Sequence, residues 1–112
     1  MTFSPDNRAN VNRYWSTIQC SAEIGQGRAG GLSRLTLSDD DQRMRDLFVN
    51  WCREAGLSVE IDELGNIFGR REGTDPTLPP VMIGSHLDTQ INGGRFDGIA
   101  GVLAGLEVVR SL

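Results

Sequence analysis

One short segment in the second half of the sequence places the strongest constraint on the fold. An apolar run typical of a strand, residues 81–83 (VMI), leads directly into residues 84–89 (GSHLDT), which contain His86, the only histidine. A second glycine-rich run, residues 93–98 (GGRFDG), follows closely. This order predicts a buried strand over residues 81–86 that ends at His86. The glycines then predict a tight loop that brings the chain back to the strand end.

Two carboxylates follow the histidine at spacings that favour a metal site. Asp88 stands two positions after His86, so in an extended chain both side chains point the same way and the carboxylate can reach the imidazole. A carboxylate on one ring nitrogen fixes the tautomer and makes the other nitrogen a better metal ligand. Asp97 lies beyond the glycine loop and can return to the strand end, where a carboxylate can bridge two cations.

Each of these residues also has an ordinary structural explanation. A lone histidine at a strand end is often only a hydrogen-bonded, partly buried side chain. Asp88 could cap the turn at Thr89, and Asp97, just ahead of an expected helix, is a natural N-cap. The residue spacing alone leaves both interpretations open.

The remaining patterns predict an α/β chain with the element order α-α-β-β-β-α. Apolar residues at helical spacing predict helices over residues 7–24, 38–56 and 98–112. Alternating and apolar runs predict strands over residues 57–64, 67–71 and 81–86. Three strands make only a small sheet, and a buried strand normally has neighbours on both sides. We therefore expect an incomplete sheet from a larger domain; the alternative is a small complete α+β domain.

Composition argues against several classes of function. The chain has 11 arginines, no lysine and a net charge of -4, so it carries no basic footprint for nucleic acid or an anionic membrane. Without a signal peptide or a membrane-spanning run, we expect a cytoplasmic protein whose Cys20 and Cys52 are buried free thiols. Residues 25–30 (GQGRAG) match a dinucleotide-binding glycine pattern, but a helical pattern precedes them instead of a strand, which predicts a surface loop.

Two stretches around the histidine resemble a known family. Residues 84–90 (GSHLDTQ) and 93–107 (GGRFDGIAGVLAGLE) are similar to the M20 metallopeptidase-like family. More narrowly they resemble its amidase/carbamoylase branch, which holds N-carbamoyl-L-amino acid hydrolases, β-ureidopropionase-like enzymes and allantoate amidohydrolases. Residues 30–35 (GGLSRL) and 62–68 (DELGNIF) share the resemblance. It implies that residues 1–112 are the N-terminal part of a zinc-peptidase-like catalytic domain, with the rest of that domain and a lid or dimerisation domain absent.

The resemblance also implies an activity. It implies a hydrolase of linear C–N amide or ureido bonds that uses a metal-activated water as nucleophile and two divalent ions, zinc or manganese. His86 and Asp97 match metal ligands, and Asp88 matches the catalytic carboxylate that orients the histidine. A small-molecule substrate and a full-length homodimer are implied as well. The family's glutamate pair and further histidine ligands have no counterpart here, so we expect this piece to be inactive alone.

Two other functions stay open at this point. One is an aminoacylase or peptidase of the same superfamily. The other, from a different class, is a non-catalytic binding module that keeps the fold.

Overall fold

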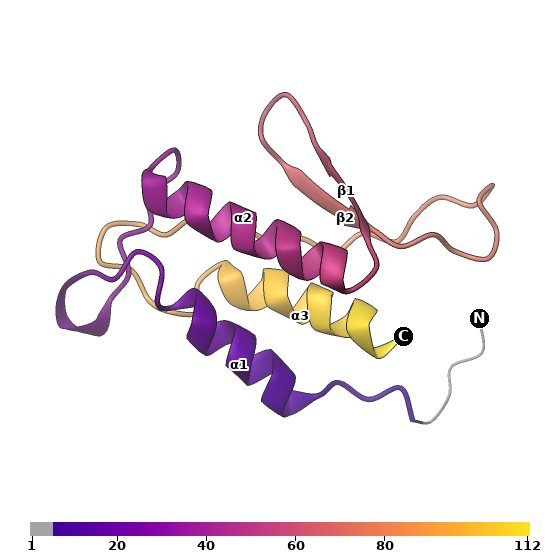
Figure 1. Ribbon diagram of the computed structural model, residues 1–112, viewed down its shortest axis with the longest axis horizontal. Coiled ribbons are helices and arrows are strands. Elements are labelled where there is room, and N and C mark those ends of the chain that lie inside the picture. The colour runs from indigo at the N-terminus through magenta and orange to yellow at the C-terminus, as the bar shows by residue number, and fades with distance from the viewer. Residues whose placement is uncertain (1–5) are drawn as a thin grey trace.

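The computed structural model describes residues 6–112, which form three helices side by side and one β-hairpin (Figure 1). The elements in chain order are α1 (Val11–Ser21), the short 3₁₀ helix η1 (Arg28–Gly30), α2 (Asp39–Glu54), β1 (Ser58–Ile61), β2 (Ile67–Arg70) and α3 (Ile99–Ser111). In Figure 1, α3 runs between α1 and α2, and the hairpin extends from the end of α2. None of the helices among these residues is long and apolar enough to cross a membrane.

The helix ends follow from local capping. The Asn10 side chain accepts a hydrogen bond from the Arg13 amide at 3.0 Å, so α1 begins later than the predicted residue 7. Ser38 caps α2 as predicted, accepting from the Asp41 amide at 3.1 Å. Gly56, at φ +79°, follows the last turn of α2 in the left-handed conformation that glycine adopts most easily.

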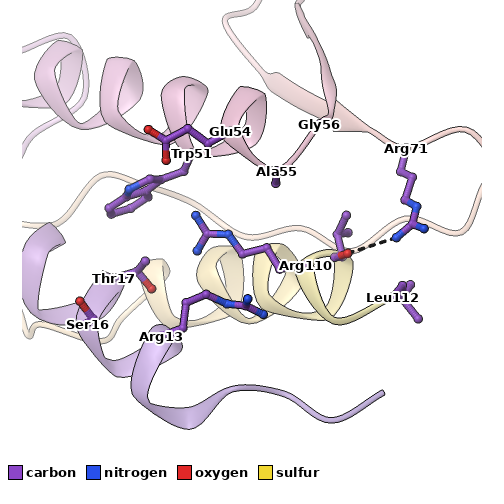
Figure 2. Close-up of a pocket in the computed structure, with 11 residues that line it drawn as sticks. Arg13, Ser16, Thr17, Trp51, Glu54, Ala55, Gly56, Arg71, Arg110 and Leu112 are labelled. Carbon is purple, nitrogen blue, oxygen red and sulfur yellow. Dashed lines mark hydrogen bonds between the residues drawn. The ribbon is translucent and has the colours of Figure 1, made fainter. Parts of the chain in front are cut away.

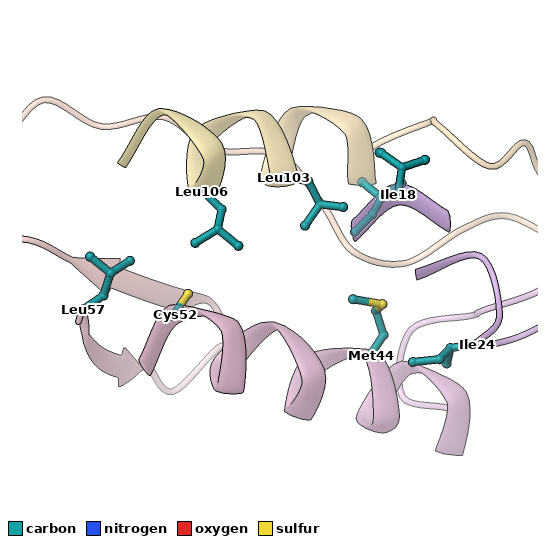
Figure 3. Packing of buried hydrophobic residues seen from close by; sticks show 8 residues of the cluster. Ile18, Ile24, Met44, Cys52, Leu57, Leu103 and Leu106 are labelled. Atoms are coloured by element: carbon teal, nitrogen blue, oxygen red, sulfur yellow. The ribbon is translucent and has the colours of Figure 1, made fainter. Parts of the chain in front are cut away.

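The core lies where α2 and α3 face each other, with α1 and the start of β1 at its edges (Figure 3). Its buried members are Ile18, Ile24, Met44, Cys52, Leu57, Ile99, Leu103 and Leu106. Burying one large aliphatic side chain stabilises a fold by roughly 1.5–3 kcal/mol, so this cluster is the main stabilising contact of the chain. The helices predicted over residues 38–56 and 98–112 both contribute apolar side chains to this core, whereas Val11, at the start of α1, is exposed.

The hairpin is shorter than predicted. β1 and β2 pair antiparallel, with Val59 opposite Gly69, and Gly65 at φ +87° forms part of the turn. Gly69 lies against the core, because a Cβ there would come within 2.9 Å of Cys52 Sγ. Ile61 lies two positions after Val59, on the same face of the strand, yet it is exposed.

The predicted buried strand over residues 81–86 is wrong. Val81, Met82 and Ile83 are 96%, 73% and 59% exposed, and the sheet formed by the described residues holds β1 and β2 alone. A strand is defined by a ladder of backbone hydrogen bonds, and within the described residues no second strand pairs with this segment. The observed order is therefore α-α-β-β-α, with residues 81–86 running alongside α3.

The two thiols are free, as predicted, but they differ in burial. Cys20 is exposed, against expectation, and Cys52 is buried in the core. Burial raises the pKa of the Cys52 thiol to about 11, partly offset by the positive charge of Arg110. The glycine pattern at residues 25–30 follows α1 and continues into η1, so it is a loop without the strand that a dinucleotide fingerprint needs.

A buried carboxylate ties α1 to α3. The Glu107 carboxylate accepts hydrogen bonds from the Asn10 amide at 2.6 Å and from Arg13 Nε and Nη2 at 2.8 and 2.7 Å. The Arg13 hydrogen bonds lower the pKa of Glu107 below its ordinary 4.5, and they outweigh the opposing effect of burial.

We expect Glu107→Gln to lower the free energy of unfolding at pH 7 by about 1–3 kcal/mol, because a neutral amide replaces a charge-assisted acceptor. The folded pKa is the lower one, so Glu107 contributes fully above pH 4.5 and its contribution disappears as pH falls through the folded value. Urea unfolding at pH 7 and pH 3 should therefore show the two proteins converging at acid pH. The matched control is Glu60→Gln, which removes an exposed carboxylate. A difference that stays constant with pH would contradict the assignment.

Candidate metal centre

His86 and Asp88 form the contact that their spacing predicts. Nδ1 of His86 lies 3.0 Å from the Asp88 carbonyl oxygen and 3.1 Å from Asp88 Oδ1. Both partners are acceptors, so in the neutral ring Nδ1 carries the hydrogen and Nε2 carries a lone pair. Nε2 is therefore the nitrogen that can bind a metal ion.

Asp97 lies on the side of that lone pair. Its Oδ2 is 3.8 Å from His86 Nε2, and its side chain is 76% exposed. Two ligand atoms held about 2.0–2.2 Å from one ion are separated by roughly 3.4 Å at a tetrahedral angle and by up to about 4 Å at wider angles. The observed separation therefore fits one ion held by both residues.

The structure does not support the simplest alternative for Asp97. The N-cap of α3 is Gly98, and the Asp97 side chain caps no helical amide. Only the main-chain carbonyl of Asp97 takes part, accepting from the Ile99 amide at 2.9 Å. The carboxylate is thus left to face the imidazole.

Asp88 is held from its other side by a residue that the sequence did not reveal. Its Oδ2 accepts a hydrogen bond from Thr36 Oγ1 at 2.9 Å, so the carboxylate lies between Thr36 and His86. The Thr89 amide bonds instead to the Arg34 carbonyl at 2.8 Å, which shows that Asp88 does not cap that turn. Thr36 is 52 positions from Asp88, and no local pattern links the two.

Gly98 forms the floor under the imidazole. A Cβ at this position would lie 2.6 Å from His86 Nε2 and overlap the ring, so the ring packs directly on the glycine backbone. Gly101 and Gly105 continue the same face of α3, where a Cβ would lie 3.0 Å from Ser85 Cβ and 3.6 Å from Ile83 Cβ. The absence of side chains at these three glycines lets residues 83–86 approach the helix closely.

The site contributes two candidate ligands. Among residues 6–112, no group of three or more His, Cys, Asp or Glu side chains is arranged to hold a metal ion. Zinc usually takes at least three protein ligands. His86 and Asp88 lie along a groove of about 580 Å³ whose other lining residues come mainly from α2, the turn before β2, β2 itself, residues 81–85 and α3. The donor set therefore fits part of a metal centre that opens onto a groove.

A second cavity, of about 770 Å³, is unsuited to a cation. It lies between α1, the end of α2 and the end of α3 (Figure 2). Arg13, Arg71 and Arg110 line it, and Glu54 is its only carboxylate side chain among the described residues. Neither His86 nor its two carboxylates belong to it.

Comparison with known proteins identifies the branch. No protein-family model matches the chain. The N-carbamoyl-L-amino-acid amidohydrolase of Rhizobium meliloti is 53% identical over 107 residues, which cover 96% of this chain and 26% of that protein. The crystal structure of a hydantoinase/carbamoylase family amidase from Burkholderia ambifaria has a TM-score of 0.90 at 57% identity, covering 93% of this chain and 26% of that one. The resemblance to the amidase/carbamoylase branch is confirmed.

The similarity extends beyond the carbamoylases. Allantoate deiminase 1 of Glycine max is 34% identical over 84 residues, which cover 75% of this chain and 17% of that protein. This chain thus spans about a quarter or less of the length of these relatives. Its mixed helix and strand structure, with a small sheet, corresponds to part of a carbamoylase domain.

We expect Gly98→Ala to displace the His86 ring, because the new methyl group would occupy the space of the imidazole. ¹⁵N NMR of the imidazole measures this directly, since the chain has one histidine. Two controls separate the causes. Gly56→Ala imposes the same positive φ with no atom within 4 Å, and Gly94→Ala imposes neither strain nor contact. Equal imidazole shifts in Gly98→Ala and Gly56→Ala would show that the ring does not rest on Gly98.

Proposed function

We propose that this chain supplies part of the catalytic, metal-binding domain of an amidase that hydrolyses linear C–N bonds of carbamoyl or ureido compounds. The observation that carries the proposal is the His86–Asp97 pair, whose facing atoms are 3.8 Å apart while Asp88 holds the opposite ring nitrogen. Support for the substrate class comes from relatives named N-carbamoyl-L-amino-acid amidohydrolase and allantoate deiminase.

The complete site in this proposal holds two divalent ions, zinc or manganese. His86 would bind one ion through Nε2, and the Asp97 carboxylate has the two oxygens needed to bridge both. Imidazole suits zinc and carboxylate suits manganese, so this donor pair accepts either metal. When bound, such ions lower the pKa of a water molecule and polarise the carbonyl group to be attacked.

The chain's own residues have the task of presenting these ligands in a fixed geometry. Asp88 accepts the Nδ1 hydrogen and thereby keeps the Nε2 lone pair directed toward Asp97. Thr36 prevents the Asp88 carboxylate from rotating away. Gly98 allows the ring to lie flat against the start of α3. In this proposal the protein is cytoplasmic, acts on a small molecule and forms a homodimer at full length.

We expect the 112-residue chain to bind Zn²⁺ weakly through His86, because two ligands anchor an ion less firmly than the usual three or four. Zn²⁺ titration followed by imidazole ¹⁵N NMR and calorimetry should show saturable binding that Asp97→Asn weakens and that His86→Ala abolishes. The control is Asp75→Asn, which removes an exposed carboxylate outside the site. Saturable binding that survives His86→Ala would place the ion elsewhere. In a longer protein containing this segment, unchanged metal content after His86→Ala would likewise reject the site.

We also expect the 112-residue chain to show no turnover of N-carbamoyl amino acids or allantoate in the presence of Zn²⁺ or Mn²⁺. The chain has one histidine, and within residues 6–112 the three site residues His86, Asp88 and Asp97 supply too few ligands for a two-ion centre. The assay is release of ammonia or free amino acid, with a longer protein that includes the segment as the positive control. Turnover by the short chain that disappears in Asp97→Asn would contradict this expectation.

A further inference from the structure

Arg34 is completely buried, yet within residues 6–112 no carboxylate lies at ion-pairing distance from it. Removing a charge from water without a counter-ion is costly, so its surroundings must compensate in another way. Burial lowers the pKa of Arg34 from its ordinary value, opposed by the more distant negative charges of Asp41, Asp40 and Asp88.

Three backbone carbonyls receive the guanidinium hydrogens. Nη1 donates to the Ser21 and Ile24 carbonyls at 2.9 and 2.8 Å, and Nε donates to the Leu87 carbonyl at 2.9 Å. Ser21 is the last residue of α1, where the partial negative charge of a helix end favours a cation. Leu87 stands between His86 and Asp88. One side chain thus connects the end of a helix to the peptide that separates the two site residues.

The main chain of Arg34 strengthens the same connection. Its amide donates to Thr89 Oγ1 at 2.9 Å, and its carbonyl accepts from the Thr89 amide at 2.8 Å. Thr89 is itself buried. Arg34 thus makes three hydrogen bonds to residues 87–89, two as donor and one as acceptor, and these constrain the backbone immediately after His86.

One feature of Arg34 argues against a role in stability alone. Its Nη2 is buried without a hydrogen-bond partner, which costs about 1–3 kcal/mol for an ordinary donor and more for a charged one. Replacing buried charges with apolar side chains of similar volume is often neutral or stabilising. A guanidinium is favoured here because its rigid fork directs Nε and Nη1 to carbonyls on two different segments, which an ammonium group cannot do.

We propose that Arg34 is a positioning residue for the candidate metal ligand: by holding the Leu87 carbonyl, it keeps Nδ1 of His86 against Asp88 and Nε2 open toward Asp97. The consequence for metal binding rests on the proposed function. The effect on the imidazole does not, because it is a property of the metal-free chain.

The first test uses the ¹⁵N shifts of the single imidazole in the metal-free 112-residue chain. The wild-type protein should show the Nδ1–H tautomer. Arg34→Met should lose that preference, and Arg34→Lys should not restore it, since an ammonium group lacks the fork. Arg13→Met is the matched control, because it removes a structural arginine whose hydrogen bonds go to Glu107. An Arg34→Met protein that is folded and retains the wild-type tautomer would overturn the proposal.

A semisynthetic Arg34→citrulline chain keeps the test decisive if Arg34→Met does not fold. Citrulline retains Nε–H and one terminal NH₂, and its oxygen can take the place of Nη2, which has no partner to lose. Positioning by the fork predicts a wild-type tautomer in this neutral variant. Loss of the Nδ1–H form in folded citrulline protein would show that the charge is what matters, and would overturn the proposal.

The second test is Zn²⁺ affinity, which we expect Arg34→Met to weaken about tenfold, as is typical for residues that orient a ligand. Arg34→citrulline and Arg13→Met should bind as the wild type does. Unchanged affinity in Arg34→Met alongside an altered tautomer would contradict the link from positioning to metal binding. A wild-type imidazole that does not respond to Zn²⁺ would reject the metal site itself, while the tautomer measurement would still decide the role of Arg34.

Discussion

The close approach between α3 and residues 83–86 is the contact on which the candidate site depends. It is possible because three glycines, the N-cap Gly98 and Gly101 and Gly105 of α3, lie opposite this segment. A Cβ at position 98 would overlap the His86 ring, one at 101 would lie 3.0 Å from Ser85 Cβ, and one at 105 would make ordinary contact with Ile83 at 3.6 Å. Positions 98, 101 and 105 follow the spacing of three and four that places residues on one side of a helix. The histidine can therefore lie over the beginning of α3, next to the carboxylate that precedes it. A side chain at position 98 would displace the His86 ring, which now faces Asp97.

Features encoded within a few neighbouring residues could be predicted from the sequence. The Ser38 cap, the glycine at position 56 just after α2 and the contact of His86 with Asp88 each involve residues no more than four positions apart. Interactions between distant segments could not. Thr36 meets Asp88 across 52 positions, and the side chain of Arg34 meets Leu87 across 53. Threonine and arginine are common surface residues, and only the fold shows that these two hold the site.

The failed strand at residues 81–86 shows the limit of apolar patterns. The run predicts burial and extension, but a strand also needs a partner that offers backbone donors and acceptors in register. Among the described residues the available ladder is used within the hairpin of β1 and β2. Residues 81–83 consequently keep their apolar side chains exposed, and the segment is positioned by side-chain packing on α3 instead. The apolar pattern thus shows that residues 81–86 are suited to a buried strand, but they do not form one because no strand among the described residues pairs with them.

The contacts that hold the candidate ligand His86 come from elements that are far apart in the sequence. Arg34, in the segment between α1 and α2, holds the backbone between His86 and Asp88. Thr36, just before α2, holds the Asp88 carboxylate, and the start of α3 supports the imidazole ring. Each constraint removes one freedom of the imidazole: its tautomer, its rotation or its distance from Asp97. A ligand ordered before the metal arrives loses less conformational entropy on binding. Together these contacts hold His86 and Asp97 facing each other, with Nε2 and Oδ2 3.8 Å apart.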